Sequence, residues 1–462
     1  MATFNICTAS DSYKFQHWNM YPTGTEKVYS YFESRTGAKY DNTVFFGLQY
    51  LLKQNFLGQV VTEEKILQAK DRIEKHLGPG SFNEAGWRYI LEKYDGKLPV
   101  KISAVQEGTP VPVNNVLMTV ENTDPKCYWL TNYLETVLTH VWSSSTVATA
   151  SREMKKVMKQ YLDWTSENPD AINFMLHDFG FRGVSSFESA AIEGAGHLVN
   201  FMGTDTFAGI ECAMDYYNTD VCAYSVPATE HSIMTAQGRD GEADLLGDLL
   251  DKYPTGILSV VIDSYNYRDF IDMAADRYKD KILARDGKVV FRPDSGNPRE
   301  VSMDVCVRLA TRFGSTQNKK VGGFGVLNPK VGLLWGDGVG PEGIKSILHT
   351  MFENGWSAEN IVFGMGGGLL QKINRDTQRF AFKSSYQERN GVGYDIYKDP
   401  IDGSKKSKRG RLMLMENNIG FKTMREGTNS PSDGENRLET VFLNGDLVRD
   451  MSFDEVRANA AV

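Results

Sequence analysis

The chain has 462 residues, of which 41% are hydrophobic and 24% are charged, and both shares are ordinary for a globular protein. This length favours about three domain units, or one barrel of about 250 residues with a companion domain. The net charge of -8 provides no basic surface for nucleic acid, so any polyanion has to be held locally. The composition therefore predicts a protein that acts on small molecules.

The five cysteines are scattered along the chain and form no C-x-x-C pair for zinc or redox chemistry, which favours a reduced, intracellular setting. The start, MATFNICTASDSYKF, lacks the basic segment and apolar core of a signal peptide. No apolar run approaches the roughly 18 residues of a membrane span. We therefore expect a cytoplasmic protein with no membrane partner.

The N-terminal third mixes strand and helix patterns. Extended apolar patterns at 27–35, 100–105 and 115–120 predict strands, and the periodicity of 62–77 predicts a helix. Residues 127–162 read as one long helix.

The middle of the chain then alternates short apolar segments with stretches of helical pattern such as 188–198 and 302–314. The apolar segments are 173–180, 198–205, 222–228, 258–265, 289–296, 332–338 and 360–368. Such alternation predicts parallel strands, covered by helices or closed into a barrel.

Five of these segments run into an aspartate near the predicted carboxyl end of the strand: Asp178, Asp205, Asp263, Asp294 and Asp337. A single Asp at such a place is equally consistent with a turn or a helix N-cap. Because the carboxyl ends of barrel strands meet at one mouth, the set predicts carboxylates around a single polar pocket.

Two loops beside these carboxylates have the composition of phosphate sites. FGMGGGLLQKINRD places Gly364, Gly366, Gly367 and Gly368 between a strand and an expected helix, where backbone N–H groups can hold an anion. FRPDSGNP places Arg292, which suits phosphate, two residues from an Asp that suits sugar hydroxyls or Mg²⁺. Together the loops indicate a phosphorylated sugar as substrate.

The nucleotide-binding fingerprints fit less well. The P-loop pattern is absent, and GVGPEG at 338–343 matches G-x-G-x-x-G in isolation, with Pro341 indicating a turn or a helix start. An NAD-dependent dehydrogenase is a weak alternative that rests on this match alone.

His231, in SVPATEHSIM, is one of seven histidines. A hydrogen-bonded core histidine is the common outcome for such a residue, and a catalytic role is the alternative that the residue types leave open.

At this point the chain resembles the nicotinamide phosphoribosyltransferases, a branch of the nicotinate phosphoribosyltransferase-like (type II) family, along nearly its whole length. The blocks that carry the resemblance are LHDFGFRGVSS, LVNFMGTDT, YSVPATEHS, VIDSY, RPDSGNP, GDGV, FGMGGGLLQKINRD and KDP...KKSKRGRL. The resemblance implies an α/β fold in which an incomplete (β/α) TIM-like barrel at 151–384 stands beside an α+β sheet domain. That sheet domain would be built from the N-terminal segment 1–150 and the C-terminal segment 385–462.

The resemblance also implies transfer of the phosphoribosyl group of 5-phosphoribosyl 1-pyrophosphate to nicotinamide, giving nicotinamide mononucleotide and pyrophosphate for NAD salvage. It further implies that Mg²⁺ is required, that ATP hydrolysis improves the yield, and that the protein is a homodimer whose active sites are shared between subunits. In this pattern Phe179 stacks on the nicotinamide ring and Tyr13 of the other subunit covers its opposite face. Asp205, with Arg182 close by, reads the amide, because a carboxylate accepts from the amide N–H₂ and repels the carboxylate of nicotinate.

The same carry-over assigns the phosphorylated groups. The ribose and its phosphate contact Arg292, Asp294, Gly336, Asp337, Gly366 and Gly367. The pyrophosphate or the ATP phosphates contact Arg35, Arg375, Lys383, Lys398 and Lys405, some of them from the partner subunit. His231 takes the γ-phosphoryl group of ATP, with Asp263 orienting its ring.

The chain departs from the family pattern at Ala381, where a serine is frequent, and at Gly332, where an arginine is common. The substitutions at these two positions predict weaker phosphate binding. The loop after Arg35 is also shorter than in the vertebrate members of the family. Two alternatives remain beside the dehydrogenase: a nicotinate phosphoribosyltransferase of the same architecture, and a catalytically inactive relative that acts as a scaffolding or secreted partner.

Overall fold

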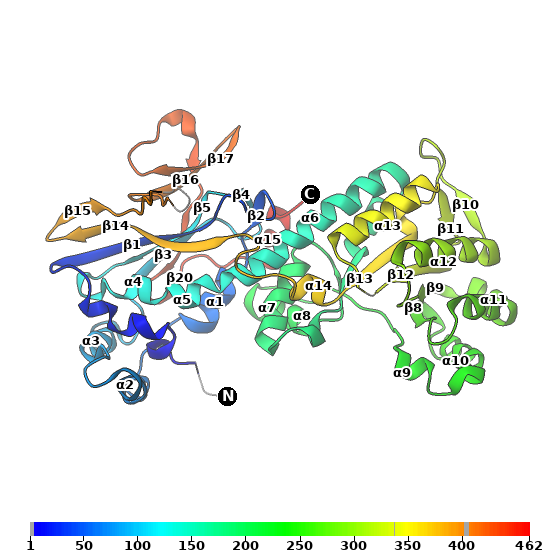
Figure 1. Ribbon diagram of the computed structural model, residues 1–462, viewed down its shortest axis with the longest axis horizontal. Helices are drawn as coiled ribbons and strands as arrows, with labels where there is room; N and C mark the ends of the chain where they lie inside the picture. The colour runs from blue at the N-terminus through cyan, green and yellow to red at the C-terminus, as the bar shows by residue number, and fades with distance from the viewer. Residues whose placement is uncertain (1–3, 337, 402–405) are drawn as a thin grey trace. The chain divides into compact units, whose positions relative to one another are not determined.

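The computed structural model describes residues 4–336, 338–401 and 406–462, which form two compact units. Unit 1 combines residues 1–149, 212–220 and 373–461, and unit 2 combines residues 150–211 and 221–372. Each unit has its own sheet (Figure 1). None of the helices in the described residues is both long enough and apolar enough to cross a membrane.

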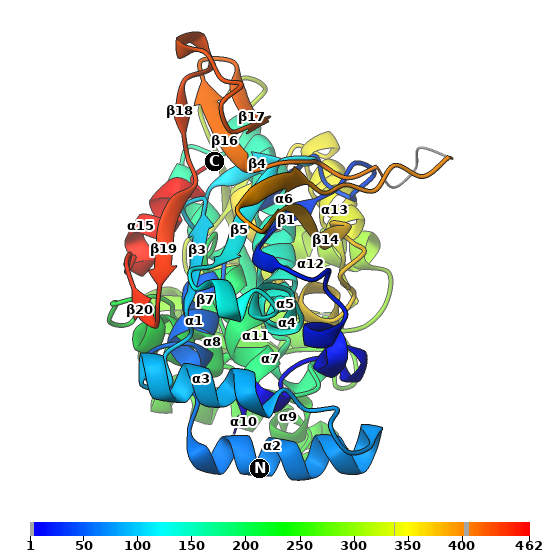
Figure 2. The ribbon, with the colours of Figure 1, turned by 90° about the vertical axis from the view of Figure 1, so that its left-hand side faces the viewer.

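Unit 1 is built around a seven-stranded sheet in the order β15-β14-β1-β5-β3-β19-β20, in which every neighbouring pair is antiparallel. Its strands are β1 (Thr25–Ser34), β3 (Val100–Ala104), β5 (Val116–Asn122), β14 (Phe380–Arg389), β15 (Val392–Asp395), β19 (Glu439–Leu443) and β20 (Asp446–Leu447). Figure 2 shows β19, β3, β5 and β1 side by side. The prediction of a sheet assembled from both chain ends is therefore confirmed.

Smaller elements complete unit 1. They are the pair β2 (Asn42–Val44) and β4 (Pro110–Pro112), and the three-stranded sheet of β16 (Leu412–Asn417), β17 (Gly420–Arg425) and β18 (Glu435–Asn436). The helices are α1 (Leu48–Asn55), α2 (Glu63–Leu77), α3 (Glu84–Tyr94), α4 (Leu130–Tyr133), α5 (Glu135–Thr139) and α15 (Phe453–Asn459). Helix α2 shows why the local sequence is helical: the Thr62 side chain caps its first turn, and Ile66, Ala69 and Ile73 form its buried face.

The long helix predicted for 127–162 is wrong in one respect, because the chain turns at Leu134 and His140 and forms α4, α5 and α6 (Val141–Thr165) instead. The two short helices pack against β1, β5 and β14. Tertiary contacts with a twisted sheet thus override the continuous helical pattern.

Unit 2 contains a six-stranded parallel sheet in the order β7-β6-β13-β12-β9-β8. The strands are β6 (Leu176–Asp178), β7 (Gly203–Thr204), β8 (Thr255–Val261), β9 (Asp286–Arg292), β12 (Val331–Trp335) and β13 (Ile361–Met365). Isolated parallel bridges join Gly203 to Tyr224 and Ala228 to Ser259, so the segment 224–229 connects the two outer strands, β7 and β8. The parallel sheet is therefore curved, and its two outer strands are linked through this segment, as expected for an incomplete barrel.

The segment 222–228 forms only these bridges, although its pattern predicts a full strand. The reason is Pro227, which has no N–H to donate; its carbonyl still accepts from the N–H of Ser259 at 2.9 Å. One position of the barrel is consequently irregular.

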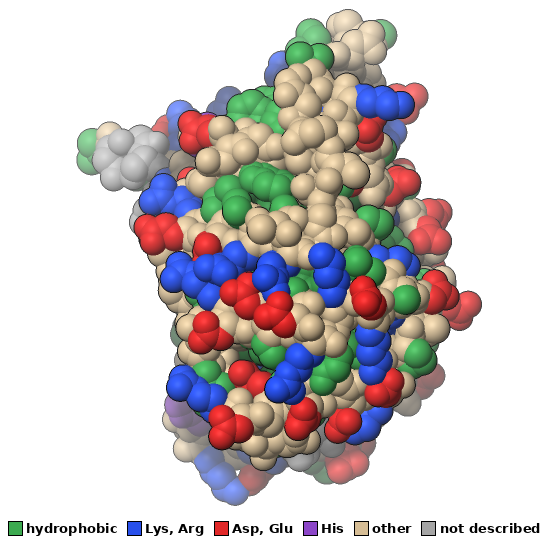
Figure 3. Space-filling model, turned by 90° about the vertical axis from the view of Figure 1, so that its right-hand side faces the viewer, with side chains coloured by type: hydrophobic (Ala, Val, Ile, Leu, Met, Phe, Trp, Pro, Cys, Tyr) green, Lys and Arg blue, Asp and Glu red, His purple; other side chains and the backbone are tan. Residues whose placement is uncertain are grey.

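The helices of unit 2 are α7 (Phe187–Leu198), α9 (His231–Met234), α10 (Gly238–Lys252), α11 (Tyr267–Ala284), α12 (Pro298–Phe313), α13 (Pro341–Glu353) and α14 (Gly367–Leu370), and α8 (Phe207–Tyr216) leads from unit 2 into unit 1. A hairpin of β10 (Ser315–Gln317) and β11 (Gly325–Leu327) follows α12. Figure 1 shows α10 to α13 along the outer side of the parallel strands. Acidic and basic side chains are interspersed on the face seen in Figure 3. Ion pairs such as that of Arg268 with Asp304 join α11 and α12.

Candidate active site

In unit 2, residues at and just after the carboxyl ends of the parallel strands surround a cavity of about 1120 Å³. This volume is sufficient for a drug-sized ligand, for which about 300–1,000 Å³ is typical. Its walls follow the carboxyl ends of β6, β7, β9, β12 and β13. Of the predicted site residues, it is lined by Phe179, Arg182, Asp205, His231, Arg292, Asp294, Gly336, Gly366 and Gly367.

Phe179 provides a planar wall of this cavity. Its backbone N–H donates to the carbonyl of Met365 at 2.9 Å, which continues the pairing of β6 with β13. Its ring lies directly over Gly364, where a Cβ atom would be 1.9 Å from the ring. The Arg292 guanidinium lies 5.1 Å from the ring centroid. Gly364 thus leaves space for the Phe179 ring. The Arg292 cation is attracted to the electron-rich face of this ring.

Asp205 lines the same cavity as Phe179, and its side chain is 46% exposed. Its Oδ1 atom accepts a hydrogen bond from the Ser225 hydroxyl and lies 3.6 Å from Nε2 of His177. Burial opposes ionisation of Asp205, but His177 and Ser225 outweigh it and hold the pKa of this carboxyl below its usual value. The cavity therefore presents a fixed negative charge beside an aromatic surface.

His231 and Asp263 form a second polar group on the wall. Nε2 of His231 lies 3.2 Å from Oδ1 of Asp263, and the imidazole is 47% exposed while the carboxylate is only 4% exposed. Oδ2 of Asp263 accepts from the backbone N–H of Asp294 at 2.9 Å and from the Ser295 hydroxyl at 2.6 Å. One buried carboxylate therefore orients both the histidine and the loop that carries Asp294.

Glycines shape the remaining wall. A Cβ atom at Gly336 would lie 2.8 Å from Nε of Arg292, so this glycine allows the arginine to reach the cavity, where Arg292 pairs with Asp294 at 3.2 Å. Gly366 is the N-cap of α14 and Gly367 is its first residue; the helix expected after the glycines is present and has four residues. Any anion held there is bound by individual N–H groups more than by a helix dipole.

The expectation that all strand-end carboxylates face one pocket is correct for Asp205 and Asp294 and wrong for Asp178 and Asp263, whose side chains are buried behind the wall. For Asp178 the reason is strand alternation, because successive side chains point to opposite faces. Asp263 lies beyond the end of β8, where His231 and the loop of Asp294 and Ser295 cover its carboxylate. Asp337 lies outside the described residues.

Several predicted residues belong to unit 1, where each has its own surroundings. Tyr13 is 64% exposed and stacks obliquely near His17. Arg35 donates from Nε to the carbonyl of Arg379 at 3.1 Å, and Lys383 pairs with the buried Glu33 at 2.9 Å. Arg375 and Lys398 are exposed, and Lys405 lies outside the described residues.

The two departures from the family pattern occupy different places. Ala381 lies in β14 opposite Glu33. Gly332 is the second residue of β12, towards the end of the strand opposite to Gly336, and the Lys288 side chain lies 3.2 Å from where a Cβ would be. The inference that Gly332 weakens phosphate binding therefore loses its basis, because the position is away from the cavity wall.

The cavity also includes residues that the sequence did not single out, namely Phe181, Phe187, Glu230, Ser232 and Lys372. Lys372 stands at the end of the GGGLLQK block, so the glycine loop itself was the available signal for it. His177 and Ser225 were also missed, since their contact with Asp205 exists only in the folded chain.

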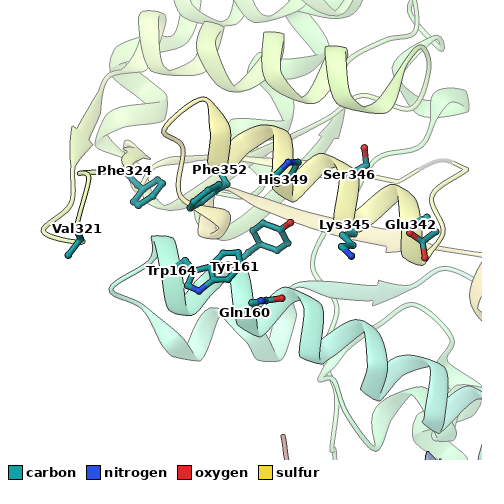
Figure 4. A pocket seen from close by; sticks show the side chains of 10 residues that line it. All are labelled: Gln160, Tyr161, Trp164, Val321, Phe324, Glu342, Lys345, Ser346, His349 and Phe352. Carbon is teal, nitrogen blue, oxygen red and sulfur yellow. The ribbon is translucent and has the colours of Figure 1, made fainter. Parts of the chain in front are cut away.

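A second cavity of about 890 Å³ lies between α6 and α13 (Figure 4). Its lining includes the aromatic residues Tyr161, Trp164, Phe324 and Phe352. Glu342, Lys345 and His349 lie along α13 at its edge. It has none of the strand-end carboxylates and glycine loops of the first cavity, which is therefore the better candidate for chemistry on a phosphorylated sugar.

No three His, Cys, Asp or Glu side chains come together as a metal-binding group anywhere in the described residues. All five cysteines are buried free thiols. Asp294 is a carboxylate of the cavity wall that could contribute an oxygen ligand to a divalent ion.

Comparison with known proteins agrees with this geometry. Residues 174–446 match the nicotinate phosphoribosyltransferase (NAPRTase) family, and residues 5–102 match the N-terminal domain of nicotinamide phosphoribosyltransferase. The chain is 44% identical to nicotinamide phosphoribosyltransferase of Xanthomonas campestris pv. campestris (strain 8004), over 99% of this chain and 98% of the relative. It is 35% identical to the enzyme of that name from Acinetobacter baylyi, over 99% and 97%.

Among solved structures, nicotinate-nucleotide pyrophosphorylase from Pyrococcus furiosus matches with a TM-score of 0.62 at 16% identity, covering 100% of this chain and 97% of the other. Human nicotinic acid phosphoribosyltransferase matches with a TM-score of 0.58 at 14% identity, covering 98% and 92%. These structures share the fold. With its sequence matched by the family over most of its length, and with the expected strand-end residues around one cavity, the chain belongs to the nicotinate phosphoribosyltransferase family.

Proposed function

We propose that the protein transfers the 5-phosphoribosyl group of 5-phosphoribosyl 1-pyrophosphate to nicotinamide, producing nicotinamide mononucleotide and pyrophosphate in NAD salvage. The observation that carries the choice of base is Asp205, a carboxylate with a lowered pKa on the wall beside the Phe179 ring. An ionised Asp205 accepts hydrogen bonds from a carboxamide N–H₂ and repels a carboxylate. Nicotinamide has the first group and nicotinate the second.

Phe179 stacks on the pyridine ring, and Tyr13 of the other subunit covers its opposite face. The exposure of Tyr13 supports this role, because the phenol is accessible to a partner. An aromatic pair of this kind binds a flat ring at a small cost in conformational entropy. Arg182, which is exposed on the cavity wall, completes the surroundings of the amide.

In the chemical step the pyridine nitrogen attacks the anomeric carbon of the ribose, and the bond from that carbon to the pyrophosphate oxygen breaks. Positive charge develops on the sugar and negative charge on the leaving group, so fixed charges on the wall stabilise the transition state. Asp294 accepts from the ribose hydroxyls, and Arg292 and the backbone N–H groups of Gly336, Asp337, Gly366 and Gly367 hold the 5'-phosphate. Mg²⁺, held mainly by the substrate phosphates, would supply positive charge to the leaving pyrophosphate.

ATP enters through His231. If Nε2 of the imidazole donates to Asp263, the lone pair of Nδ1 is available to attack the γ-phosphorus, and ADP leaves as the bond to the β–γ bridging oxygen breaks. The supporting observation is that the imidazole is exposed to the cavity while its carboxylate partner is buried. A phosphohistidine adds negative charge that organises Mg²⁺ and pyrophosphate.

The cations of unit 1, Arg35, Arg375, Lys383, Lys398 and Lys405, bind the pyrophosphate or the ATP phosphates in a homodimer whose subunits share active sites. Arg and Lys are the residues suited to such groups. A sedimentation measurement of the protein with and without substrates tests the dimer, and a monomer that turns over at full rate would contradict it.

A nicotinate phosphoribosyltransferase is the second candidate, since the matching family carries that name. Steady-state rates with nicotinamide and with nicotinate, each with phosphoribosyl pyrophosphate and Mg²⁺ in the presence and absence of ATP, separate the two. We expect the amide to have the higher kcat/KM and ATP to increase the yield. A preference for nicotinate would support the second candidate, and no mononucleotide from either base would refute both.

A further inference from the structure

Asp178 is a fully buried carboxylate to which the proposed reaction assigns no role. It is the last residue of β6, between His177 and Phe179. His177 and Phe179 lie on the same side of the strand, with ring centroids 5.5 Å apart. Strand alternation places Asp178 on the opposite side, where its Oδ2 atom would be 3.6 Å from a Cβ at Gly194 of α7. The carboxylate is therefore directly behind the wall that carries Phe179.

From this position Asp178 contacts both loops that form the base pocket. Its Oδ1 atom accepts from the backbone N–H of Gly180 at 2.7 Å, at the turn that leads into residues 181–183 and Arg182. Its backbone carbonyl accepts from the N–H of Asp205 at 2.9 Å. Gly180 has no room for a side chain, since a Cβ there would be 2.6 Å from Leu370 and 2.9 Å from Oδ1 of Asp178.

We propose that Asp178 is a positioning residue for the pyridine base: its carboxylate fixes the turn at Gly180 and so holds Phe179 and Arg182 on the cavity wall beside Asp205. The inference rests on the proposed function, because it assigns the base pocket to this wall. It concerns binding of the ring and leaves the phosphate contacts untouched.

Oδ2 of Asp178 is buried without a hydrogen bond among the described residues, as is the Thr206 hydroxyl. The carboxylate is therefore held to the chain through the Gly180 N–H at Oδ1. Burial raises the pKa of Asp178 to about 6, the Gly180 N–H opposes this, and the charge of Asp205 reinforces it.

The sign of the pH effect follows from this raised pKa. Above pH 6 the carboxylate is ionised and accepts strongly from the Gly180 N–H; below pH 6 it is protonated and accepts more weakly. Affinity for the base is therefore expected to fall as the pH drops through about 6. A raised pKa means that the folded state binds the proton more tightly than the unfolded chain. The contribution of this group to stability therefore increases as the pH drops through about 6, while the affinity for the base decreases.

The test compares Asp178→Ala, which removes the contact, with Asp178→Asn, whose amide oxygen can still accept from Gly180. Glu242→Gln in α10 is the matched control, because this carboxyl of unit 2 is also buried with a raised pKa and does not line the cavity. For Asp178→Ala we expect KM for nicotinamide to rise by roughly tenfold or more, as a lost hydrogen bond to a charged group predicts, and KM for phosphoribosyl pyrophosphate to change by less than about twofold. Asp178→Asn retains most of the affinity at pH 8 and lacks the fall near pH 6, and Glu242→Gln behaves as the native protein in both respects.

Thermal melting at pH 8 keeps the test independent of general damage. Asp178→Asn is expected to melt no lower than the native protein, because it removes a buried charge. An unchanged KM for nicotinamide in Asp178→Ala, an equal rise of both KM values, or the same pH dependence in Asp178→Asn would overturn the proposal. A native protein that prefers nicotinate would overturn the choice of base alone, and the same variants would then be measured with nicotinate. A native protein that is inactive with both bases would overturn the proposed function itself.

Discussion

Replacing Asp205 with Asn tests the electrostatic selection of the base. The substitution preserves the size of the side chain and its ability to accept from the Ser225 hydroxyl, and it removes the charge. Two unit charges about 4 Å apart interact by about 1 kcal/mol in bulk water and about 4 kcal/mol at the effective dielectric of a protein surface. Because the Asp205 side chain is 46% exposed, its effect belongs in the lower part of this range.

A repulsion of about 1–2 kcal/mol corresponds to roughly a 5- to 30-fold change in preference. We therefore expect the ratio of kcat/KM for nicotinamide to kcat/KM for nicotinate to fall by this factor in Asp205→Asn, chiefly through a better rate with nicotinate. The lowered pKa of Asp205 keeps the carboxylate ionised at pH 5, so the native protein is expected to retain its preference there.

The measurement is the initial rate with each base at saturating phosphoribosyl pyrophosphate, at pH 5 and pH 8. Asp294→Asn serves as the comparison, because loss of a ribose contact is expected to slow both bases alike. An Asp205→Asn variant with an unchanged ratio at both pH values would refute the electrostatic reasoning.

Three further predictions concern other parts of the chain. Gly364→Ala places a methyl group 1.9 Å from the present position of the Phe179 ring; we expect an overpacking cost of about 1–3 kcal/mol in thermal melting and a higher KM for nicotinamide. His231→Ala should abolish ATP hydrolysis and most of the rate while stability changes by less than about 0.5 kcal/mol, because the side chain is half exposed; full ATP-coupled turnover would contradict the phosphohistidine. Glu33→Gln removes the buried carboxylate between Lys383 and Lys408 and should lower stability by roughly 1–3 kcal/mol, less than for a fully buried pair, as denaturant unfolding would show.

Much of the fold could be predicted because its signals are local. The alternation of apolar and helical segments corresponds to β6, β7, β8, β9, β12 and β13 with their intervening helices. The errors occurred where a tertiary contact or a single residue breaks a regular pattern. The predicted long helix is interrupted by turns at Leu134 and His140 before α6 begins. Pro227 reduces the predicted strand 222–228 to two isolated bridges.

The candidate site was predictable to a similar degree. The residue types that suit a base, a ribose and phosphates stand at strand ends in the sequence, and the cavity brings Phe179, Asp205, His231, Arg292 and Asp294 together. His177 and Ser225 were not predictable, because their distance from Asp205 depends on how two loops approach each other.

The sequence by itself determined the family, the parallel α/β pattern and the presence of an aspartate near the end of five predicted strands. Only the tertiary structure decided what each aspartate does: Asp205 and Asp294 face the cavity, Asp263 orients His231 from behind, and Asp178 supports the turn at Gly180. For Asp178 the physical reason is that a strand exposes successive side chains on opposite faces, so a shift of one residue exchanges wall and core. For Asp263 it is the packing of the following loop, whose Asp294 N–H and Ser295 hydroxyl bind the carboxylate. Position along the chain specifies the edge of the sheet, and packing specifies the face.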